Sequence, residues 1–408
     1  MKRNHFYLHD STKYHPFILI VLGIFCFTAC EKDSLLVYTA YPVQESSLKL
    51  QHQIESLAIP IDSTTADVFE WPQYKQLNGQ DFIFSFNSNT YHLKVYERKA
   101  NRIVSNIQLY EEGPEGLGHI KDFYIHNWDS IFIMSDFFIY IIDSTGYIKQ
   151  TFDINLAASG SHDFSPLVMS SANEMGRFGI WFEAKEKSIY SYYHPSNIPL
   201  NQAEYYDYPI EAAFSLSTQT TTEVAIYYSN LYRQEDAYYG YLNIPLRSVA
   251  DSLFIYSFPV DPNIYVFNHI TKVLSIKGGK SKFIETKALS LSPSENNSEK
   301  MMQHIISSPL YFNVLYDPYR QLYYRFQLAP LEFKRPDGKY NGLSDKKASL
   351  MVFDSEFQLI EELEMDAYSL QLIFSFVTPE GLWVASNQND QEDYIEYDIF
   401  KFEKQLNK

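Results

Sequence analysis

The sequence predicts an all-β protein of the β-propeller type, preceded by a short N-terminal targeting segment. The chain holds 34 Tyr and 30 Phe but only 15 Gly, and large aromatic residues favour pleated, half-buried strands. A unit of aromatic-aliphatic strand, Asp or Asn turn and second strand also recurs weakly along the whole chain. Recurrence of this kind is more typical of a propeller than of a sandwich.

Residues 1–29 are predicted to be a lipoprotein signal peptide. The start is basic, and Phe17–Ala29 is an uncharged run of the length typical of a signal core. That run is too short to cross a membrane as a helix, which takes roughly 20 residues. Phe27–Cys30 resembles a bacterial lipobox, although Phe stands where that motif usually has Leu. The resemblance implies cleavage before Cys30, followed by acylation of that residue.

Other roles for the two cysteines fit the sequence less well. Cys26 and Cys30 are separated by three residues, whereas a Cys-x-x-Cys redox motif has two between its thiols. A zinc site would need further Cys or His ligands at close spacing, and the chain has no other Cys. Lipidation of Cys30 therefore remains the favoured prediction.

The remainder is predicted to be a lipidated tether over residues 30–45 and a single domain over residues 46–408. No stretch is long and polar enough to be a linker that divides the chain in two. The formal net charge of −17 argues against nucleic acid as a partner and against electrostatic docking on anionic lipid. The lipid on Cys30 would therefore have to hold the protein at the membrane.

Strand signals begin early in this domain. The alternating run Leu48–Ile54 is expected to pair with the last strands and close the ring. Tyr91–Leu109 then contains two alternating runs around a polar turn, and Asp129–Ile154 repeats the plan. The turn Asp143–Gly146 suits this position, because Asp bonds its own backbone and Gly accepts positive φ.

Similar strand units continue to the C-terminus, interrupted by one helix signal. The units cover Asp251–Ile276, Ala348–Met365, Leu372–Ser386 and Tyr394–Lys404. Ser298–Ser307 could form about three helical turns, within an insertion that begins at residue 277. At about 40–50 residues per blade the length allows six to eight blades.

Two segments, Glu112–Ser135 and Asn313–Phe326, resemble a known family, with a weaker match at Glu380–Asp390. The family is the group of Bacteroidota lipoproteins called domain of unknown function 4221, related in pattern to six-bladed, TolB-like propellers. The resemblance favours six blades and implies no catalytic residues. The matching residues are Gly113, Pro114, Gly116, Gly118, Phe123, His126, Asp129, Ser130, Tyr316, Asp317, Arg320, Tyr323, Tyr324 and Arg325.

The same resemblance bears on localisation. Lipoproteins of that group are often sent to the cell surface by acidic and lysine residues just after the acylated Cys. Here Glu31, Lys32 and Asp33 follow Cys30, which is similar in kind but short of acidic residues. The outer membrane is therefore expected, with the cell surface favoured over the periplasmic face.

Local motifs for chemistry are weak. Gly113–Gly118 spaces its glycines as G-x-x-G-x-G, which is not a dinucleotide fingerprint, and strand signal follows where a helix is needed. Asn387–Asp393 gathers oxygen ligands but lacks the Gly and the final Glu of a calcium loop. The carboxylates of Glu111–Glu115 are expected to be solvated rather than catalytic. Neither a metal nor a cofactor is predicted.

Six residues are candidates for ligand binding. If 321–326 is a strand, Tyr323 and Arg325 share one face, and a ring beside a guanidinium suits sugars or carboxylates. The alternative is packing between blades, with Arg325 or Arg320 fixed by Asp317. The remaining two candidates are His126 and Trp128, which lie in the matching segment Glu112–Ser135. A structural role is the alternative for both.

The overall prediction is a non-catalytic binding or scaffolding propeller. One alternative is a glycan- or peptide-binding accessory of a nutrient-uptake system, with an envelope protein or glycan as partner. The other is a propeller-type hydrolase or lyase whose carboxylates come from several blades. The centre of the ring distinguishes them: converging buried carboxylates with His, Tyr or Arg favour an enzyme, an aromatic patch favours binding, and a bland polar channel favours scaffolding.

Overall fold

The computed structural model describes residues 38–62, 69–154, 164–166, 176–195, 198–234, 237–284, 287–295, 297–366, 370–386 and 393–405. Tyr38–Lys408 form one compact unit. The predicted signal peptide, Cys30, the first part of the tether and nearly all of the oxygen-rich loop 387–393 lie outside the described residues. In the part that is described, no helix is long and apolar enough to cross a membrane.

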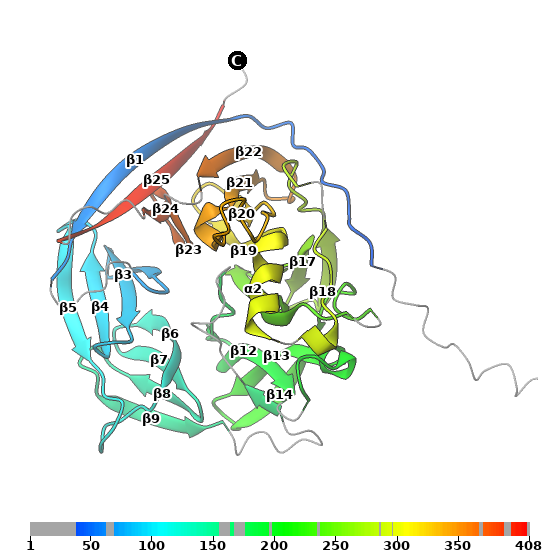
Figure 1. The fold of residues 1–408 in the computed structure, drawn as a ribbon. Helices are drawn as coiled ribbons and strands as arrows, with labels where there is room; N and C mark the ends of the chain where they lie inside the picture. Colours follow the sequence, from blue (N-terminus) through cyan, green and yellow to red (C-terminus); the bar gives the residue numbers. More distant parts are fainter. Residues whose placement is uncertain are drawn as a thin grey trace, which may run out of the picture. The chain divides into compact units, whose positions relative to one another are not determined.

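The protein is an all-β, six-bladed β-propeller (Figure 1). Each blade is an antiparallel sheet whose strands follow one another from the centre to the rim, which is the arrangement predicted by the recurrent strand units. In the third blade two short segments, β10 and β11, both pair with β12. The first three blades consist of β2 (Gln73–Leu77), β3 (Gln80–Asn87), β4 (His92–Glu97) and β5 (Arg102–Gln108); β6 (Ile120–Asn127), β7 (Ser130–Ser135), β8 (Phe138–Ile142) and β9 (Ile148–Asp153); and β10 (Phe164–Pro166), β11 (Trp181–Glu183), β12 (Ser188–Pro195), β13 (Pro209–Ser215) and β14 (Thr220–Tyr227).

The fourth to sixth blades follow the same plan, except that the sixth takes its outermost strand from the N-terminal side of the chain. They consist of β15 (Leu246–Ala250), β16 (Leu253–Phe258), β17 (Asp261–Asn268) and β18 (Val273–Lys277); β19 (Leu310–Asp317), β20 (Leu322–Leu328), β21 (Lys347–Phe353) and β22 (Leu359–Asp366); and β23 (Leu370–Thr378), β24 (Gly381–Ser386), β25 (Tyr394–Lys404) and β1 (Leu50–Pro60).

Pairing of β1 with β25 closes the ring, which confirms the expectation for the early alternating run. The two strands are antiparallel over eleven residue pairs, from Leu50 opposite Lys404 to Pro60 opposite Tyr394. Figure 1 shows the blue N-terminal strand lying beside the red C-terminal one. These segments are distant in sequence, so their pairing is a long-range contact that completes the sixth blade.

The residues just before β1 are bound to the propeller. Tyr38 donates its hydroxyl proton to Oδ1 of Asp261 at 3.1 Å, and the backbone N–H of Tyr41 donates to Oδ1 of Asn263 at 2.9 Å. Further along, the N–H of Ser46 donates to the backbone oxygen of Leu359 at 2.8 Å. The described part of the predicted tether therefore lies against the fourth and fifth blades.

One α-helix, α2 (Ser298–Ser307), lies in the insertion between β18 and β19 and has the predicted bounds. Asn297 caps its start, because its side-chain oxygen accepts from the N–H of Lys300 at 3.0 Å. At the other end, the Lys346 ammonium donates to the last carbonyl oxygens. The described residues also contain short 3₁₀ helices: η1 (Ala203–Asp207), η2 (Gly240–Asn243), η3 (Pro293–Glu295) and η4 (Leu343–Asp345).

The tyrosine-rich stretch 225–242 is mainly core rather than surface. Tyr228, Tyr232 and Tyr239 are buried between the third and fourth blades; Tyr232 packs edge to face on Tyr239 and at a tilted angle on Tyr228. The Tyr192 hydroxyl lies 2.8 Å from that of Tyr228, so the buried polar ends satisfy each other. This stretch therefore stabilises the ring from inside.

Candidate functional site

A central cavity of about 300 Å³ lies among the inner strands of the propeller. Five of the six blades contribute to its wall through β2, β11 and the residues before it, β15, β19 and β23. The wall combines aromatic rings, amides, hydroxyls and two arginines. Its polar and aromatic members are Trp71, Gln73, Tyr74, Arg177, Trp181, Arg247, Ser248, Asn313, Tyr316, Ser375 and Phe376.

The first arginine, Arg177, is held from behind by Asp122 on the inner strand of the second blade. Its Nη2 lies 2.9 Å from Oδ1 of Asp122, whose side chain is only 2% exposed. Asp122 also accepts backbone N–H bonds from Phe123 at 2.8 Å and from Ile180 at 2.6 Å. Burial raises the pKa of Asp122, while Arg177 and these N–H donors act in the opposite direction.

A glycine allows Arg177 to adopt this position. A Cβ on Gly179 would come within 2.6 Å of Nε of Arg177, so a larger residue there would displace the guanidinium. The carbonyl of the same glycine accepts from Nη2 of Arg247. The segment before β11 thus brings both arginines to one side of the cavity.

The second arginine, Arg247 on β15, is paired with a buried glutamate. Its Nη1 lies 2.5 Å from Oε1 of Glu211, and the Tyr256 hydroxyl donates to the other glutamate oxygen. The guanidinium also lies 4.8 Å and 5.0 Å from the ring centres of Phe178 and Phe254. The Arg247 side chain is 1% exposed, so its charge is strongly constrained by these neighbours.

The ionisation of Glu211 decides the charge of this cluster. Burial is the main cause that raises the pKa of Glu211 to about 7, while Arg247 and the Tyr256 hydrogen bond act to lower it. Burial thus disfavours the charged form of Glu211, and Arg247 favours it. Both arginines line the cavity, while both carboxylates lie behind them.

The described cavity wall offers few groups for acid–base chemistry besides the Tyr74 and Tyr316 hydroxyls, which donate to Asp81 and Asp251. Among the described lining residues there is no Asp, Glu, His or Cys. Asp122 and Glu211 meet part of the criterion for an enzyme, since they are buried carboxylates beside Arg and Tyr. However, each of their oxygens already accepts a hydrogen bond from the protein, and both lie behind the arginines. The geometry therefore suits electrostatic binding better than proton transfer.

The rest of the wall offers flat apolar faces and neutral hydrogen-bonding groups. Trp71 packs edge to face on Phe374, with ring centres 5.5 Å apart, and Tyr316 packs on Tyr323 at 5.0 Å. Asn313 donates to the Ser248 hydroxyl at 3.4 Å. The described residues contain no group of three or more His, Cys, Asp or Glu that could hold a metal ion.

The structure gives Arg325 a full set of internal partners. The residue is 0% exposed, and its guanidinium lies 4.5 Å from the centre of the Tyr311 ring. Nη2 donates to the Ser257 hydroxyl at 2.7 Å, which links β20 to the fourth blade. Its remaining hydrogen bonds go to the backbone oxygens of Asp261, Pro262, Gly279 and Phe312.

Asp317, Arg320 and Tyr323 are also engaged within the protein. Arg320 Nη1 donates to Oδ2 of Asp317 at 3.0 Å, and Nη2 donates to the backbone oxygen of Pro379 in the sixth blade at 2.9 Å. Tyr323 stacks on Phe357 with ring centres 4.1 Å apart. These contacts agree with packing between blades, and a ligand role for these residues stays a prediction.

Trp128 and His126 face different neighbours. Trp128 packs on Phe82 and Phe84 of the first blade, at 5.0 Å and 5.3 Å between ring centres. His126 is exposed and contacts Phe182 of the third blade edge to face at 5.2 Å. Burial and the nearby Lys75 lower the pKa of His126. The six predicted residues therefore do not form one site.

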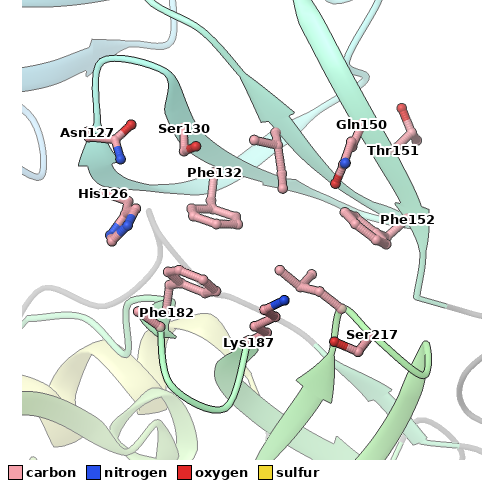
Figure 2. Close-up of a pocket in the computed structure, with 13 residues that line it drawn as sticks. His126, Asn127, Ser130, Phe132, Gln150, Thr151, Phe152, Phe182, Lys187 and Ser217 are labelled. Atoms are coloured by element: carbon pink, nitrogen blue, oxygen red, sulfur yellow. The ribbon is translucent and has the colours of Figure 1, made fainter.

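His126 instead lines a second cavity, between the second and third blades. This inter-blade groove has a volume of about 720 Å³. Figure 2 shows Phe132 of the second blade and Phe182 of the third facing each other across it. Lys187 also reaches into the groove from the turn between β11 and β12 (Figure 2).

A sequence profile described as Domain of unknown function (DUF4221) matches residues 47–364. The match covers most of the chain, including both arginines of the central cavity and their carboxylate partners. The chain belongs to the DUF4221 family. No curated protein matches this DUF4221 chain in sequence.

Two solved structures share the fold of this DUF4221 protein. A DUF4221 member from Bacteroides vulgatus is 19% identical, with a TM-score of 0.76 over 88% of this chain and 100% of that one. A putative exported protein from Bacteroides fragilis is 10% identical, with a TM-score of 0.51 over 88% of this chain and 98% of that one. At these identities the similarity concerns the fold alone.

Sequence reasoning missed the four charged residues of the central cavity. Asp122 and Arg177, like Glu211 and Arg247, are far apart in sequence, so no short motif connects them. One weak signal was available, because Asp122 and Glu211 each interrupt an apolar strand, in Ile120–Asn127 and Pro209–Ser215. A charge in such a run is costly unless it is paired.

Proposed function

We propose that this DUF4221 protein is a lipid-anchored, exported binding protein whose central cavity holds a small anionic ligand without transforming it. The observation that carries the proposal is the placing of charge: arginines line the cavity, while their carboxylates lie behind them and are already bonded. Such an arrangement offers donors to an incoming anion and no free base to act on it.

The ligand should carry a carboxylate on a ring-sized body. Arg177 and Arg247 supply positive charge at one side of the cavity, and their carboxylate partners lie behind them. Trp71 and Tyr316 supply flat apolar faces, as in sites that receive sugar rings. A volume of about 300 Å³ is at the lower end of the range for ligand pockets, roughly 300–1,000 Å³. An acidic monosaccharide is the class that meets these conditions.

Export and anchoring are supported by the N-terminal sequence. The lipobox-like Phe27–Cys30 would place a lipid on Cys30, and the outer membrane is the expected location, with the cell surface favoured. One structural neighbour carries the description of a putative exported protein. Replacing Cys30 by Ala should release the protein from the membrane fraction; unchanged membrane retention would refute the anchor.

Isothermal titration calorimetry on the full chain in detergent tests the binding. Glucuronate and galacturonate should bind, whereas glucose and galactose should not, because the neutral sugars lack the carboxylate. The variant should be the pair Asp122→Asn with Arg177→Gln, which removes both charges together and avoids a buried unpaired Asp. Its counterpart, Asp207→Asn with Arg233→Gln, removes a surface pair with a separation of 3.2 Å.

The double variant of Asp122 and Arg177 should lose uronate binding, and the double variant of Asp207 and Arg233 should keep it. Equal affinity for neutral and acidic sugars would refute the role of the arginines. Turnover of a bound uronate to a new product would instead favour the enzyme alternative. Absence of binding by either uronate would overturn the proposed ligand class.

A further inference from the structure

We infer that the inter-blade groove between the second and third blades is a docking site for a short, extended acidic peptide with apolar side chains. The groove is separate from the central cavity, and the two share no lining residue among those described. It is also the larger of the two, at about 720 Å³ against about 300 Å³. The inference therefore goes beyond the proposed function and does not depend on it.

The shape of the groove suits an extended chain. Its wall on the second blade runs across all four strands, from His126 on β6 to Phe152 on β9. Neighbouring strands are about 4.8 Å apart, so four strands extend over about 14 Å. An extended peptide advances about 3.3 Å per residue, so roughly four residues would fill that length.

The floor of the groove is apolar. Phe132 and Phe182, one from each blade, pack on each other with ring centres 4.4 Å apart, and Phe182 is the more exposed of the two. Figure 2 shows this pair at one end of the gap and Phe152 further along the same wall. Ile141 and Leu216 complete the apolar lining. Alternate side chains of an extended peptide point to the same face, so two apolar side chains would reach this floor.

The edges of the groove can pair with a peptide backbone. Gln150 and Thr151 lie on β9, and Ser217 lies on the turn between β13 and β14 of the opposite blade. Their amide and hydroxyl groups can both donate and accept hydrogen bonds. Figure 2 shows Gln150 and Ser217 on the two sides of the gap, whereas the Thr151 hydroxyl points away from it. Such neutral groups fix the position of a chain without selecting its charge.

Charge selects the partner. The chain has 50 acidic residues, yet none of the described residues that line the groove is Asp or Glu. Lys187 projects into the groove, and among the described residues no carboxylate lies within salt-bridge distance of it. A partner with carboxylates would therefore be attracted by Lys187 and would meet no repulsion from the lining. A basic partner would find no matching charge.

Fluorescence anisotropy with the full chain in detergent can test the assignment. The probes are three fluorescein-labelled hexapeptides that alternate aspartate with phenylalanine, lysine with phenylalanine, or aspartate with serine. Only the first combines acidic and apolar side chains, and it alone should bind. Binding of the lysine peptide, or equal binding of the aspartate–serine peptide, would overturn the proposal.

Two substitutions in one turn supply a matched comparison. Lys187→Glu reverses the charge inside the groove and should weaken binding of the aspartate–phenylalanine peptide by about tenfold or more. Lys185→Glu reverses an exposed charge that does not line the groove and should leave affinity within about twofold. An equal loss in both variants would mean general electrostatic attraction and would overturn the site.

A third variant and a second readout separate this site from the central cavity. Phe182→Ser removes half of the apolar floor and should also weaken peptide binding. The Lys187→Glu and Phe182→Ser variants should keep wild-type circular dichroism and wild-type uronate affinity. Failure of the peptide to bind while uronate binding persists would remove only this inference; the opposite pattern would remove only the proposed function.

Discussion

Replacing Lys346 by Met is expected to destabilise the propeller, although Lys346 touches neither cavity wall described above. The side chain is buried, and its ammonium donates to the backbone oxygens of Ile305 at 2.9 Å, Ile306 at 2.9 Å and Ser308 at 2.6 Å. These carbonyls lie at the C-terminal end of α2, where intrahelical partners run out. Lys346 thus joins the insertion to the start of β21.

The magnitude follows from which carbonyls keep a partner. Ile306 also accepts from the N–H of Leu331 at 3.0 Å, whereas Ile305 and Ser308 would lose their ammonium donor. Each buried carbonyl left without a partner costs about 1–3 kcal/mol, which gives about 4 kcal/mol for two. The substitution also removes the desolvation cost of the buried Lys346 ammonium, which offsets part of this loss. The free energy of unfolding should therefore fall by about 2–4 kcal/mol.

A change in pH dependence should accompany the loss. Burial lowers the pKa of Lys346 from 10.5 to about 7 in the folded protein. Between these two values the unfolded chain binds more protons than the folded one, so the stability of the wild type should rise with pH across this window. The slope from one such group is at most about 1.4 kcal/mol per pH unit. Lys346→Met should remove it.

Urea unfolding of the full chain at several pH values measures both effects. The control is Lys347→Met, because Lys347 is the adjacent residue but is 80% exposed and forms only a surface pair with Glu364. Loss of this surface pair should lower the free energy of unfolding by less than about 1 kcal/mol. A Lys346 variant as stable as the wild type, or a Lys347 variant equally destabilised, would refute the reasoning.

Three further predictions follow from the fold. Arg325→Lys should lower the free energy of unfolding by about 2–4 kcal/mol, because a lysine cannot reach all the acceptors of the buried guanidinium. Urea unfolding checks this, and an unchanged midpoint would refute the structural role of Arg325. Ile59→Ala should lower the free energy of unfolding by about 2–4 kcal/mol, because Ile59 is a buried residue of the strand that closes the ring. Thermal unfolding measures this loss, with Val104→Ala on the exposed side of β5 as the control. Chelation should leave the melting temperature unchanged, because the oxygen-rich loop 387–393 has Glu392 where a calcium loop needs Gly, and Asp398 stands where such a loop needs its final Glu. A drop of several degrees would disprove this.

Much of the architecture could be predicted because it depends on local patterns. Alternation located most strands, Asp143 and Gly146 form the predicted turn, and α2 has the predicted bounds. Ring closure by β1 was also predictable, since a lone early strand needs a partner. The length of the chain alone did not determine the number of blades, because the connections range from short turns to the long insertion that carries α2.

The candidate sites depend on contacts between blades, which local patterns do not encode. His126 and Trp128 are two residues apart and would share a face in a regular strand. However, the register of β6 shifts between Ile125 and Asn127, and the strand ends at Asn127. As a result, His126 faces the third blade and Trp128 faces the first. Their proximity in sequence therefore does not place them at one site.

The residues that carry the family resemblance and those that line the central cavity share Tyr316 but are otherwise different. Arg320 bonds the sixth blade through Pro379, and Arg325 bonds the fourth blade through Ser257. These residues hold neighbouring blades together, so family membership can specify the ring without specifying its ligand. Arg177 lies outside Glu112–Ser135 and Asn313–Phe326, the two segments that carry the resemblance, and it takes no part in the links made by Arg320 and Arg325. A relative that kept the inter-blade arginines but lacked Arg177 should therefore keep the propeller and lose affinity for uronates.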